Sequence, residues 1–414
     1  MTDWTATRAA GEARMAAFVP RMGRRYANGR NTDAGPGQHK AVSQLSPYLR
    51  RRLLLESNVV AAAIAAHGPE GAEKFVQEVV WRGYFKGWLE RRPQVWASTR
   101  DGLERDLASL DKDRRLRRAV ADAEAGRTGL ACMDAWAAEL VGTGYLHNHA
   151  RMWFASIWIF TLGLPWRLGA DFFLRHLVDG DPASNTLGWR WVAGLHTRGK
   201  AYQAQAWNIA TFTNNRFTPR AADLADPVQA LDHLEPEGLP AILPLRAFTA
   251  PRPAVPTALL ITEEDCRVED FDLASLDIRA TWTLEASHLR STGAVADGVV
   301  RFERAALADA AARTGRAAEA LRAGVPSDLA AWAVRAGVTQ IATPYIPQGP
   351  LRDWITAAMP ALEARGIALT EWRRDWDSAI WPHATAGFLK VKERIPKILA
   401  ELLPPPAQGI LPGL

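Results

Sequence analysis

The chain has 414 residues, 48% hydrophobic and 23% charged, which is long enough for two folded domains and typical of a globular protein. Its apolar runs are too short to span a membrane and its first residues lack the features of a signal peptide, so we expect a cytoplasmic protein with no membrane partner. The two cysteines, Cys132 and Cys266, are too few for a disulfide framework, a cysteine metal site or a four-thiolate iron–sulfur cluster, and we expect no metal.

Charge divides the chain into two parts. Residues 1–220 carry 31 Lys and Arg against 20 Asp and Glu, a difference of +11, whereas the rest carries 19 against 25, a difference of −6. A basic front part favours a polyanionic partner, although basic faces are often only solvated. The same part holds 11 of the 17 tryptophans, more indoles than core packing usually needs, because each buried N–H requires a partner.

Residues 1–220 are predicted to form an all-helical domain. Apolar residues recur there at helical spacing, Gly and Pro separate the segments, and alternating strand patterns are absent. Asp179-Gly180-Asp181-Pro182 is predicted to be a turn that directs two carboxylates inward. The expected helices cover residues 53–66, 70–91, 114–125, 132–140, 150–162 and 166–178.

The second part of the chain has a different residue pattern. Prolines interrupt residues 221–255, which we interpret as a linker. In residues 256–414 short apolar runs alternate with helical patterns, which indicates a small α/β domain with a mostly parallel sheet. The expected strands are 258–262, 278–284, 338–342 and 367–372, and the expected helices are 304–313, 317–323, 328–336, 351–365 and 390–403.

Two short motifs in the front part carry groups able to bind a ligand. In the run Val42 to Arg50, hydroxyls precede a proline at a helix start and offer donors to an anion, although a helix cap is the simpler reading. Glu78, Trp81 and Arg82 have the spacing that places residues on one helical face. That face is either one wall of a pocket or a solvated ion pair worth a few tenths of a kcal/mol.

Amides, arginine and carboxylates recur among aromatic residues between positions 144 and 191. Asn148, Arg151 and Met152 share helical spacing, and an amide both donates to and accepts from the edge of a heterocycle. Buried carboxylates require cations, and Arg151 is the natural partner of Asp179 or Asp181. His147 and His149 have no carboxylate at zinc-site spacing, so we interpret them as structural rather than metal-binding.

Together these four motifs resemble the helical FAD-binding domain of the photolyase/cryptochrome family, most closely members that split cyclobutane pyrimidine dimers. The resemblance covers about residues 20–215 and follows the family's order and spacing. It implies that FAD lies bent inside the helical domain and that Asn185, near the flavin, favours its reduced form. The cofactor contacts that it implies are Tyr26, Ser43, Gln44, Leu45, Ser46, Arg82, Asn148, Arg151, Asp179, Asp181 and Asn185.

The resemblance also implies a pocket for damaged DNA. Two indoles stack on a flipped dinucleotide, as in photolyases, and Glu78 hydrogen-bonds the dimer while an excited, reduced flavin lends it an electron. The residues implied to contact DNA or the lesion are Arg30, Glu78, Trp81, His149, Met152 and Trp191. Those implied to act in catalysis or electron transfer are Glu78, Asn148, Trp166 and Trp189.

Several positions depart from the family pattern. Val42 replaces a threonine, Tyr145 a tryptophan, and His149 an arginine that contacts DNA. Trp166 and Trp189 match the two members of the family's tryptophan chain nearer the flavin, but residues 97–135 contain no tryptophan for the distal member. Either photoreduction is slow or another indole replaces it, from the set Trp88, Trp96, Trp136, Trp153 and Trp158.

Three hypotheses of function remain. The first is blue-light repair of cyclobutane dimers in UV-damaged DNA by a monomer. The second is a cryptochrome-like photoreceptor without repair, which His149 and the missing tryptophan favour. The third is a flavoprotein whose light response is vestigial. In the family an α/β antenna domain usually precedes the helical one, so we expect residues 256–414 to be a rearranged antenna-like domain, whose chromophore the sequence does not identify.

Overall fold

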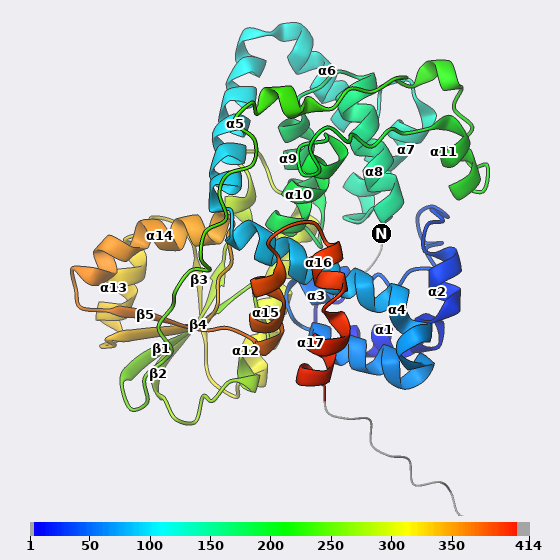
Figure 1. Ribbon diagram of the computed structural model, residues 1–414. Coiled ribbons are helices and arrows are strands. Elements are labelled where there is room, and N and C mark those ends of the chain that lie inside the picture. The colour runs from blue at the N-terminus through cyan, green and yellow to red at the C-terminus, as the bar shows by residue number, and fades with distance from the viewer. Residues whose placement is uncertain (1–3, 404–414) are drawn as a thin grey trace, which may run out of the picture.

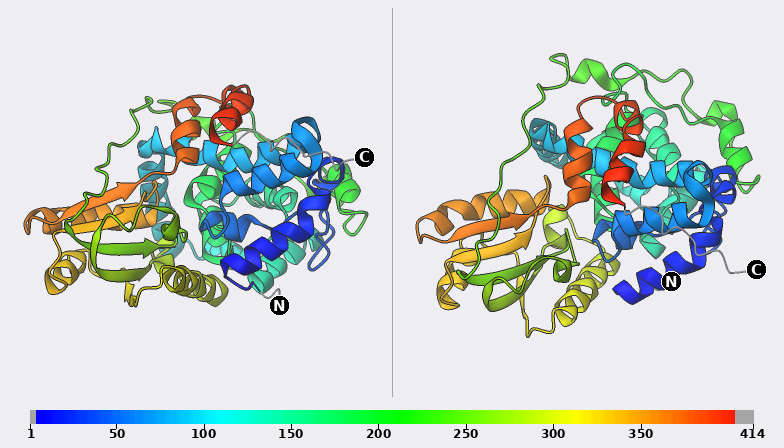
Figure 2. Two further views of the ribbon diagram at one scale, coloured as in Figure 1. Left: turned by 90° about the horizontal axis from the view of Figure 1, so that it is seen from below. Right: turned by 60° about the horizontal axis from the view of Figure 1, so that its bottom comes forward.

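The computed structural model of the chain describes residues 4–403. A helical lobe and a lobe built on a β-sheet lie against each other (Figures 1 and 2). Among the described residues, no helix combines the length and the apolar character needed to cross a bilayer. The outer ends of the two predicted domains, residues 1–3 and 404–414, lie outside the described part.

The front part of the chain is helical, as its residue pattern predicts, and described residues before position 256 form no strand. Its longest helical segment, α4 (Glu56–Glu90), is interrupted at Gly68, whose backbone is not helical and whose φ of 70° suits glycine, so two helical arms meet there, as predicted. The other helices of this lobe are α1 (Arg8–Phe18), α2 (Arg24–Gly29), α3 (Ser46–Arg50), α5 (Pro93–Lys112), α6 (Arg114–Glu124), α7 (Ala131–Thr143), α8 (Asn148–Ser156), α9 (Trp166–His176), α10 (Pro182–Val192) and α11 (Ala206–Phe212).

The second lobe contains five parallel strands in the order β3-β2-β1-β4-β5, which confirms the predicted α/β class. The strands are β1 (Pro256–Thr262), β2 (Asp277–Glu285), β3 (Glu319–Arg322), β4 (Gln340–Pro344) and β5 (Ala368–Trp372). Helix α12 (Asp297–Arg313) covers one face of the sheet, while α13 (Asp328–Arg335) and α14 (Pro350–Glu363) cover the other. Accordingly, Leu259 and Ile261 of β1 pack with the first face and Ala258 and Leu260 with the second.

One predicted helix is wrong. Residues 317–323 were expected to be helical because they are rich in alanine, but Glu319–Arg322 form the edge strand β3 paired with β2. Only Leu321 of this four-residue strand is buried. Pairing with β2 and the burial of one leucine outweigh the helix propensity of the alanines, which is worth only tenths of a kcal/mol per residue.

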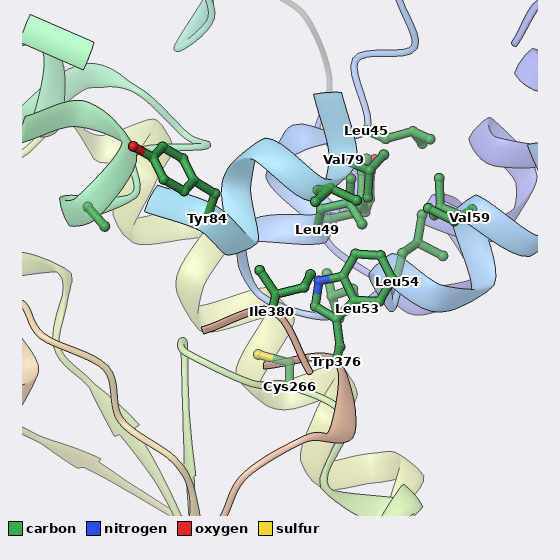
Figure 3. Close-up of a cluster of buried hydrophobic side chains, with 14 of the residues drawn as sticks. Leu45, Leu49, Leu53, Leu54, Val59, Val79, Tyr84, Cys266, Trp376 and Ile380 are labelled. Atoms are coloured by element: carbon green, nitrogen blue, oxygen red, sulfur yellow. The ribbon is translucent and has the colours of Figure 1, made fainter. Parts of the chain in front are cut away.

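After β5 the chain returns to the helical lobe. Helices α15 (Asp375–Ile380), α16 (Leu389–Lys392) and α17 (Ile395–Leu402) follow, and α15 and the 3-10 turn Trp381–His383 pack against α4 (Figure 1). Figure 3 shows Trp376 and Ile380 of α15 among leucines of the helical lobe, with Cys266 of the sheet lobe close by. The two lobes therefore share one hydrophobic core.

A buried ionic interface joins the lobes at the carboxyl end of β1. Three consecutive arginines at the end of α3 meet three consecutive acidic residues after β1: Arg50 lies 2.7 Å from Glu264, Arg51 3.1 Å from Glu263, and Arg52 3.6 Å from Asp265. Burial raises the pKa of Glu263, but the guanidinium groups of Arg290, Arg50 and Arg51 outweigh it and bring that pKa down to about 2. The sheet lobe is thus held against the loop that leads into α4.

Candidate functional site

A cavity of about 690 Å³ opens in the helical lobe between α2, α4, α8 and α10. Its size and its aromatic, polar-edged wall are those of a small-molecule site. Most residues predicted from the sequence to form the site line it together. They are Tyr26, Arg30, Ser46, Glu78, Trp81, Arg82, Asn148, His149, Arg151, Met152, Asp179, Asp181, Asn185, Trp189 and Trp191.

Helices α4 and α8 supply one wall of the cavity. The helical spacing of Glu78, Trp81 and Arg82 brings all three to it, as predicted. Arg30, at the end of α2, forms an ion pair with Glu78, so the carboxylate has a cation beside it. On α8, Asn148 directs its Nδ2 toward the sulfur of Met152 at 4.0 Å, one helical turn away.

The turn between α9 and α10 supplies the acidic wall. Arg151 donates to both oxygens of Asp179, at 3.1 and 2.8 Å, which confirms the predicted pair. Burial alone raises the pKa of Asp179, but Arg151 outweighs it and lowers that pKa. Asp181 caps α10 by accepting from the Ser184 backbone N–H and is surrounded by the cations Lys86, Arg82 and Arg50. Despite burial, these cations, Lys86 foremost, keep its pKa far below the ordinary value.

Asn185 and Trp189 on α10 form the inner wall. The amide Nδ2 of Asn185 donates to the Ala170 carbonyl at 2.8 Å, which leaves Oδ1 as the acceptor for a ring N–H. The ring of Trp189 lies 6.3 Å from that of Trp158, edge to face. Trp158 was one of the indoles considered as a replacement for the distal tryptophan, and among that set it is the one with a ring contact to Trp189.

Four predicted site residues lie outside the cavity wall. Ser43 accepts from the Leu45 backbone N–H, Gln44 accepts from Arg14, and the Leu45 side chain is in the hydrophobic core (Figure 3). Trp166 is buried at the start of α9 with the Arg167 guanidinium 5.0 Å from its ring centre. Their side chains face other partners, so their roles toward the cofactor and in electron transfer stay predictions.

Two residues at the site escaped the sequence prediction. Lys86 lies one turn beyond Arg82 on α4, and the periodicity that selected Arg82 also indicates Lys86. Arg50 donates to the Gly180 carbonyl at 2.9 Å and so holds the turn between the two aspartates. Its only signal is the run of three arginines, and its carboxylate partner Glu264 lies 214 residues further along the chain.

The predicted histidines have structural partners. His149 contacts the Asn31 carbonyl at 3.0 Å and the Tyr202 hydroxyl at 3.3 Å, and burial lowers its pKa. His147 caps α8 by accepting from the His149 backbone N–H, and burial lowers its pKa to about 3. Both imidazoles are therefore neutral at physiological pH.

One buried group in the described residues, Asp33, His39 and Glu139, has the proximity of metal ligands. His39 lies between the carboxylates, with Nε2 2.7 Å from Glu139 and Nδ1 3.8 Å from Asp33. Asp33 also accepts from Trp136 and Arg216. These contacts link the segment after α2 to α7 and to the segment after α11.

Comparisons with known proteins agree with this geometry. Residues 75–226 match the family model for the FAD binding domain of DNA photolyase. A deoxyribodipyrimidine photo-lyase of Streptomyces griseus is 36% identical over 173 residues, 42% of this chain and 35% of that protein. One of Thermus thermophilus is 35% identical over 192 residues, 46% of this chain and 43% of that protein. A cryptochrome DASH of Ostreococcus tauri is 33% identical over 205 residues, 45% of this chain and 36% of that protein.

Residues 75–226 of the helical lobe are therefore similar to the FAD binding domain of DNA photolyase, and this similarity points to FAD as the cofactor. The matches span less than half of these relatives' lengths. A solved bacterial class III photolyase of Agrobacterium tumefaciens is 23% identical, with a TM-score of 0.42 over 59% of this chain and 53% of that one.

The donor set of the cavity fits FAD. Arg82 reaches Asp181 and the Ser46 carbonyl only at 3.5 and 3.4 Å, so its guanidinium keeps donors for a phosphate. Trp189 lines the cavity, and its buried Nε1 has no hydrogen-bond partner among the described residues. A Cβ built on Gly188, also on this wall, meets no atom within 4 Å, so the wall is open there. Cations, an unpaired N–H and open space are what a phosphate-bearing flavin requires.

Proposed function

We propose that this protein repairs cyclobutane pyrimidine dimers in UV-damaged DNA in blue light. One observation carries the proposal: the residues implied to contact the lesion and most of those implied to hold the flavin line the same cavity. The reduced flavin, as electron donor, and the pyrimidine dimer, as acceptor, would therefore lie next to each other in one cavity. A monomer in the cytoplasm, the state expected from the sequence, is part of the proposal.

When bound and reduced, FAD supplies an electron on excitation by blue light. Arg82 and Ser46 would hold its phosphates, and Asn185 Oδ1 would accept a hydrogen bond from the flavin ring. Trp81 and Trp191 form the apolar walls that stack on a flipped dinucleotide, and Met152 lines the same cavity. Glu78 hydrogen-bonds the edge of the damaged bases, and Arg30 keeps that carboxylate in place.

The photoreceptor hypothesis is the alternative, and His149 favours it. At this position repair enzymes of the family have an arginine that contacts DNA, whereas His149 is held by Asn31 and Tyr202 and is neutral. It therefore offers no charge to a phosphate. A protein of this kind would take up the flavin and respond to light without releasing pyrimidines from dimers.

One experiment separates these functions. The purified protein is loaded with FAD, reduced, mixed with an oligonucleotide that contains a thymine dimer, and illuminated with blue light while thymine absorbance is followed. Repair predicts recovery of absorbance only in the light. Full flavin occupancy without recovery rejects repair and favours the photoreceptor.

We also propose that the sheet lobe is an antenna-type domain following the helical domain. Its parallel order β3-β2-β1-β4-β5 and a cavity of about 450 Å³, between α5, α9 and the carboxyl side of the sheet, support this. Trp96 and Trp354 line that cavity and suit a flat chromophore. Mass spectrometry of small molecules released on denaturation tests it: flavin as the sole chromophore after purification from the native source contradicts it.

A further inference from the structure

The indole of Trp81 has an aromatic neighbour from the far end of the chain. The ring centre of Phe388 lies 3.9 Å from that of Trp81, with 33° between the planes, the shortest such distance among the ring pairs of the described residues. Trp81 lines the cavity but Phe388 does not. Phe388 therefore packs on the side of the indole away from the cavity and backs it.

The segment that carries Phe388 is seated on α4 by two glycines one turn apart. A Cβ on Gly83 would lie 3.1 Å from Ile380, and one on Gly87 would lie 2.8 Å from the backbone of Trp381. The absence of side chains at these positions lets α15 and the following turn approach α4 closely. Gly83 and Gly87 occupy one side of the helix, while Glu78 and Arg82 reach the cavity from another.

Hydrogen bonds fix the loop between that turn and Phe388. The hydroxyl of Tyr84 donates to the Ala386 carbonyl at 2.8 Å, and Arg92 donates to the Thr385 carbonyl at 2.9 Å. The next residue, Leu389, is 71% exposed and points away from this packing. The hydrogen-bonded residues before Phe388 thus hold it in place, whereas the side chain of Leu389 faces solvent.

We propose that Phe388 is a positioning residue for substrate recognition: it holds the Trp81 indole at the angle at which that ring stacks on a damaged dinucleotide. The segment after the sheet lobe thereby supports, from behind, a wall of the helical lobe's cavity. The substrate part of this inference rests on the proposed function, whereas the positioning of Trp81 by Phe388 does not.

Fluorine NMR tests the positioning directly. The FAD-loaded protein carries 5-fluorotryptophan at its 17 tryptophans, and the resonance lost in Trp81→Phe identifies Trp81. Phe388→Ala and Phe388→Leu are expected to shift and broaden that resonance, because the leucine keeps apolar volume without a ring face. Leu389→Ala, the matched control, should leave it unchanged. An unmoved Trp81 resonance in folded Phe388→Leu overturns the inference.

Affinity for an oligonucleotide with one thymine dimer tests the consequence. Phe388→Leu should weaken dimer binding roughly two- to tenfold, which is the loss of affinity that corresponds to the energy of one aromatic pair. Flavin occupancy and affinity for undamaged DNA should stay unchanged. In a Trp81→Ala background the same change should have no further effect. Equal losses in both backgrounds overturn the substrate role. If the unmodified protein does not prefer dimers, the repair proposal fails, while the fluorine spectrum still decides whether Phe388 orients Trp81.

Discussion

Glu78 presents a carboxylate to the cavity, and the change Glu78→Gln tests its role. The amide keeps the shape but loses the charge that accepts strongly from the base edge, and a hydrogen bond to a charged group is worth about 1.5–3 kcal/mol. We expect the quantum yield of dimer repair to fall roughly tenfold or more while FAD stays bound. Repair yield and flavin absorbance, measured on the same sample, check this.

Glu70→Gln is the matched control, since Glu70 is an exposed carboxylate on the same helix, outside the cavity. Its repair yield should equal that of the unmodified protein. If Glu78→Gln repairs as well as this control, Glu78 has no part in the reaction.

Arg151 and Asp179 form the ion pair of the acidic wall, in which Asp179 is buried and Arg151 is half-buried. Arg151→Ala leaves the Asp179 carboxylate buried without its cation, which should cost about 2–4 kcal/mol of the free energy of unfolding. The double change Arg151→Ala with Asp179→Asn removes the uncompensated charge and should restore part of that loss. Urea unfolding of the FAD-free protein measures both, and a double variant no more stable than Arg151→Ala argues against the pair.

At the scale of elements, α4 organises the site. Its residue spacing indicated from sequence alone that Glu78, Trp81 and Arg82 share a face, and the strands β1, β2, β4 and β5 were visible as short apolar runs. The four-residue strand β3 was not, because only one of its side chains is buried. Phe388 and Arg50 could not be found in this way, because their partners depend on how distant segments pack and local periodicity carries no information on that.

The ion pairs of Glu263 with the arginines before α4 make the stability of the fold depend on pH in the acid range. Because the folded pKa of Glu263 is about 2, below its ordinary value of 4.5, the stabilisation is present above pH 4.5 and is lost as pH falls toward 2. Glu263→Gln should flatten this fall by about 2 kcal/mol between those limits. Chemical unfolding at several pH values measures it.

Glu319→Gln serves as the reference for this experiment, because Glu319 pairs with Arg335 on the exposed edge strand. The free energy of unfolding of Glu319→Gln should depend on pH in the same way as that of the unmodified protein. A Glu263→Gln profile parallel to that reference would show that the buried ion pairs do not set the acid limit. Measurements below pH 4.5 also avoid Glu303, whose pKa burial and the charge of Glu263 raise to about 7.

At the scale of the whole molecule, the shared hydrophobic core and the buried arginines join the two lobes into one body. The two lobes differ in the sign of their net charge. The excess of 11 basic groups lies in residues 1–220, the part that contains the cavity. The sheet lobe carries the acidic excess and stands beside the helical lobe in both views of Figure 2. A polyanion is therefore expected to meet the helical lobe.

This asymmetry predicts how binding responds to salt. Each phosphate neutralised by Lys or Arg releases counterions, so with about four contacts a fourfold rise in salt should weaken DNA binding roughly a hundredfold. Fluorescence anisotropy of a labelled dimer-containing duplex measures the slope, and flavin absorbance after filtration shows whether the cofactor stays bound. The preference for damaged over undamaged DNA should persist across the series, since stacking in the cavity depends little on salt. Affinity that does not change with salt would mean that the basic helical lobe is only solvated and that phosphates are not its partners.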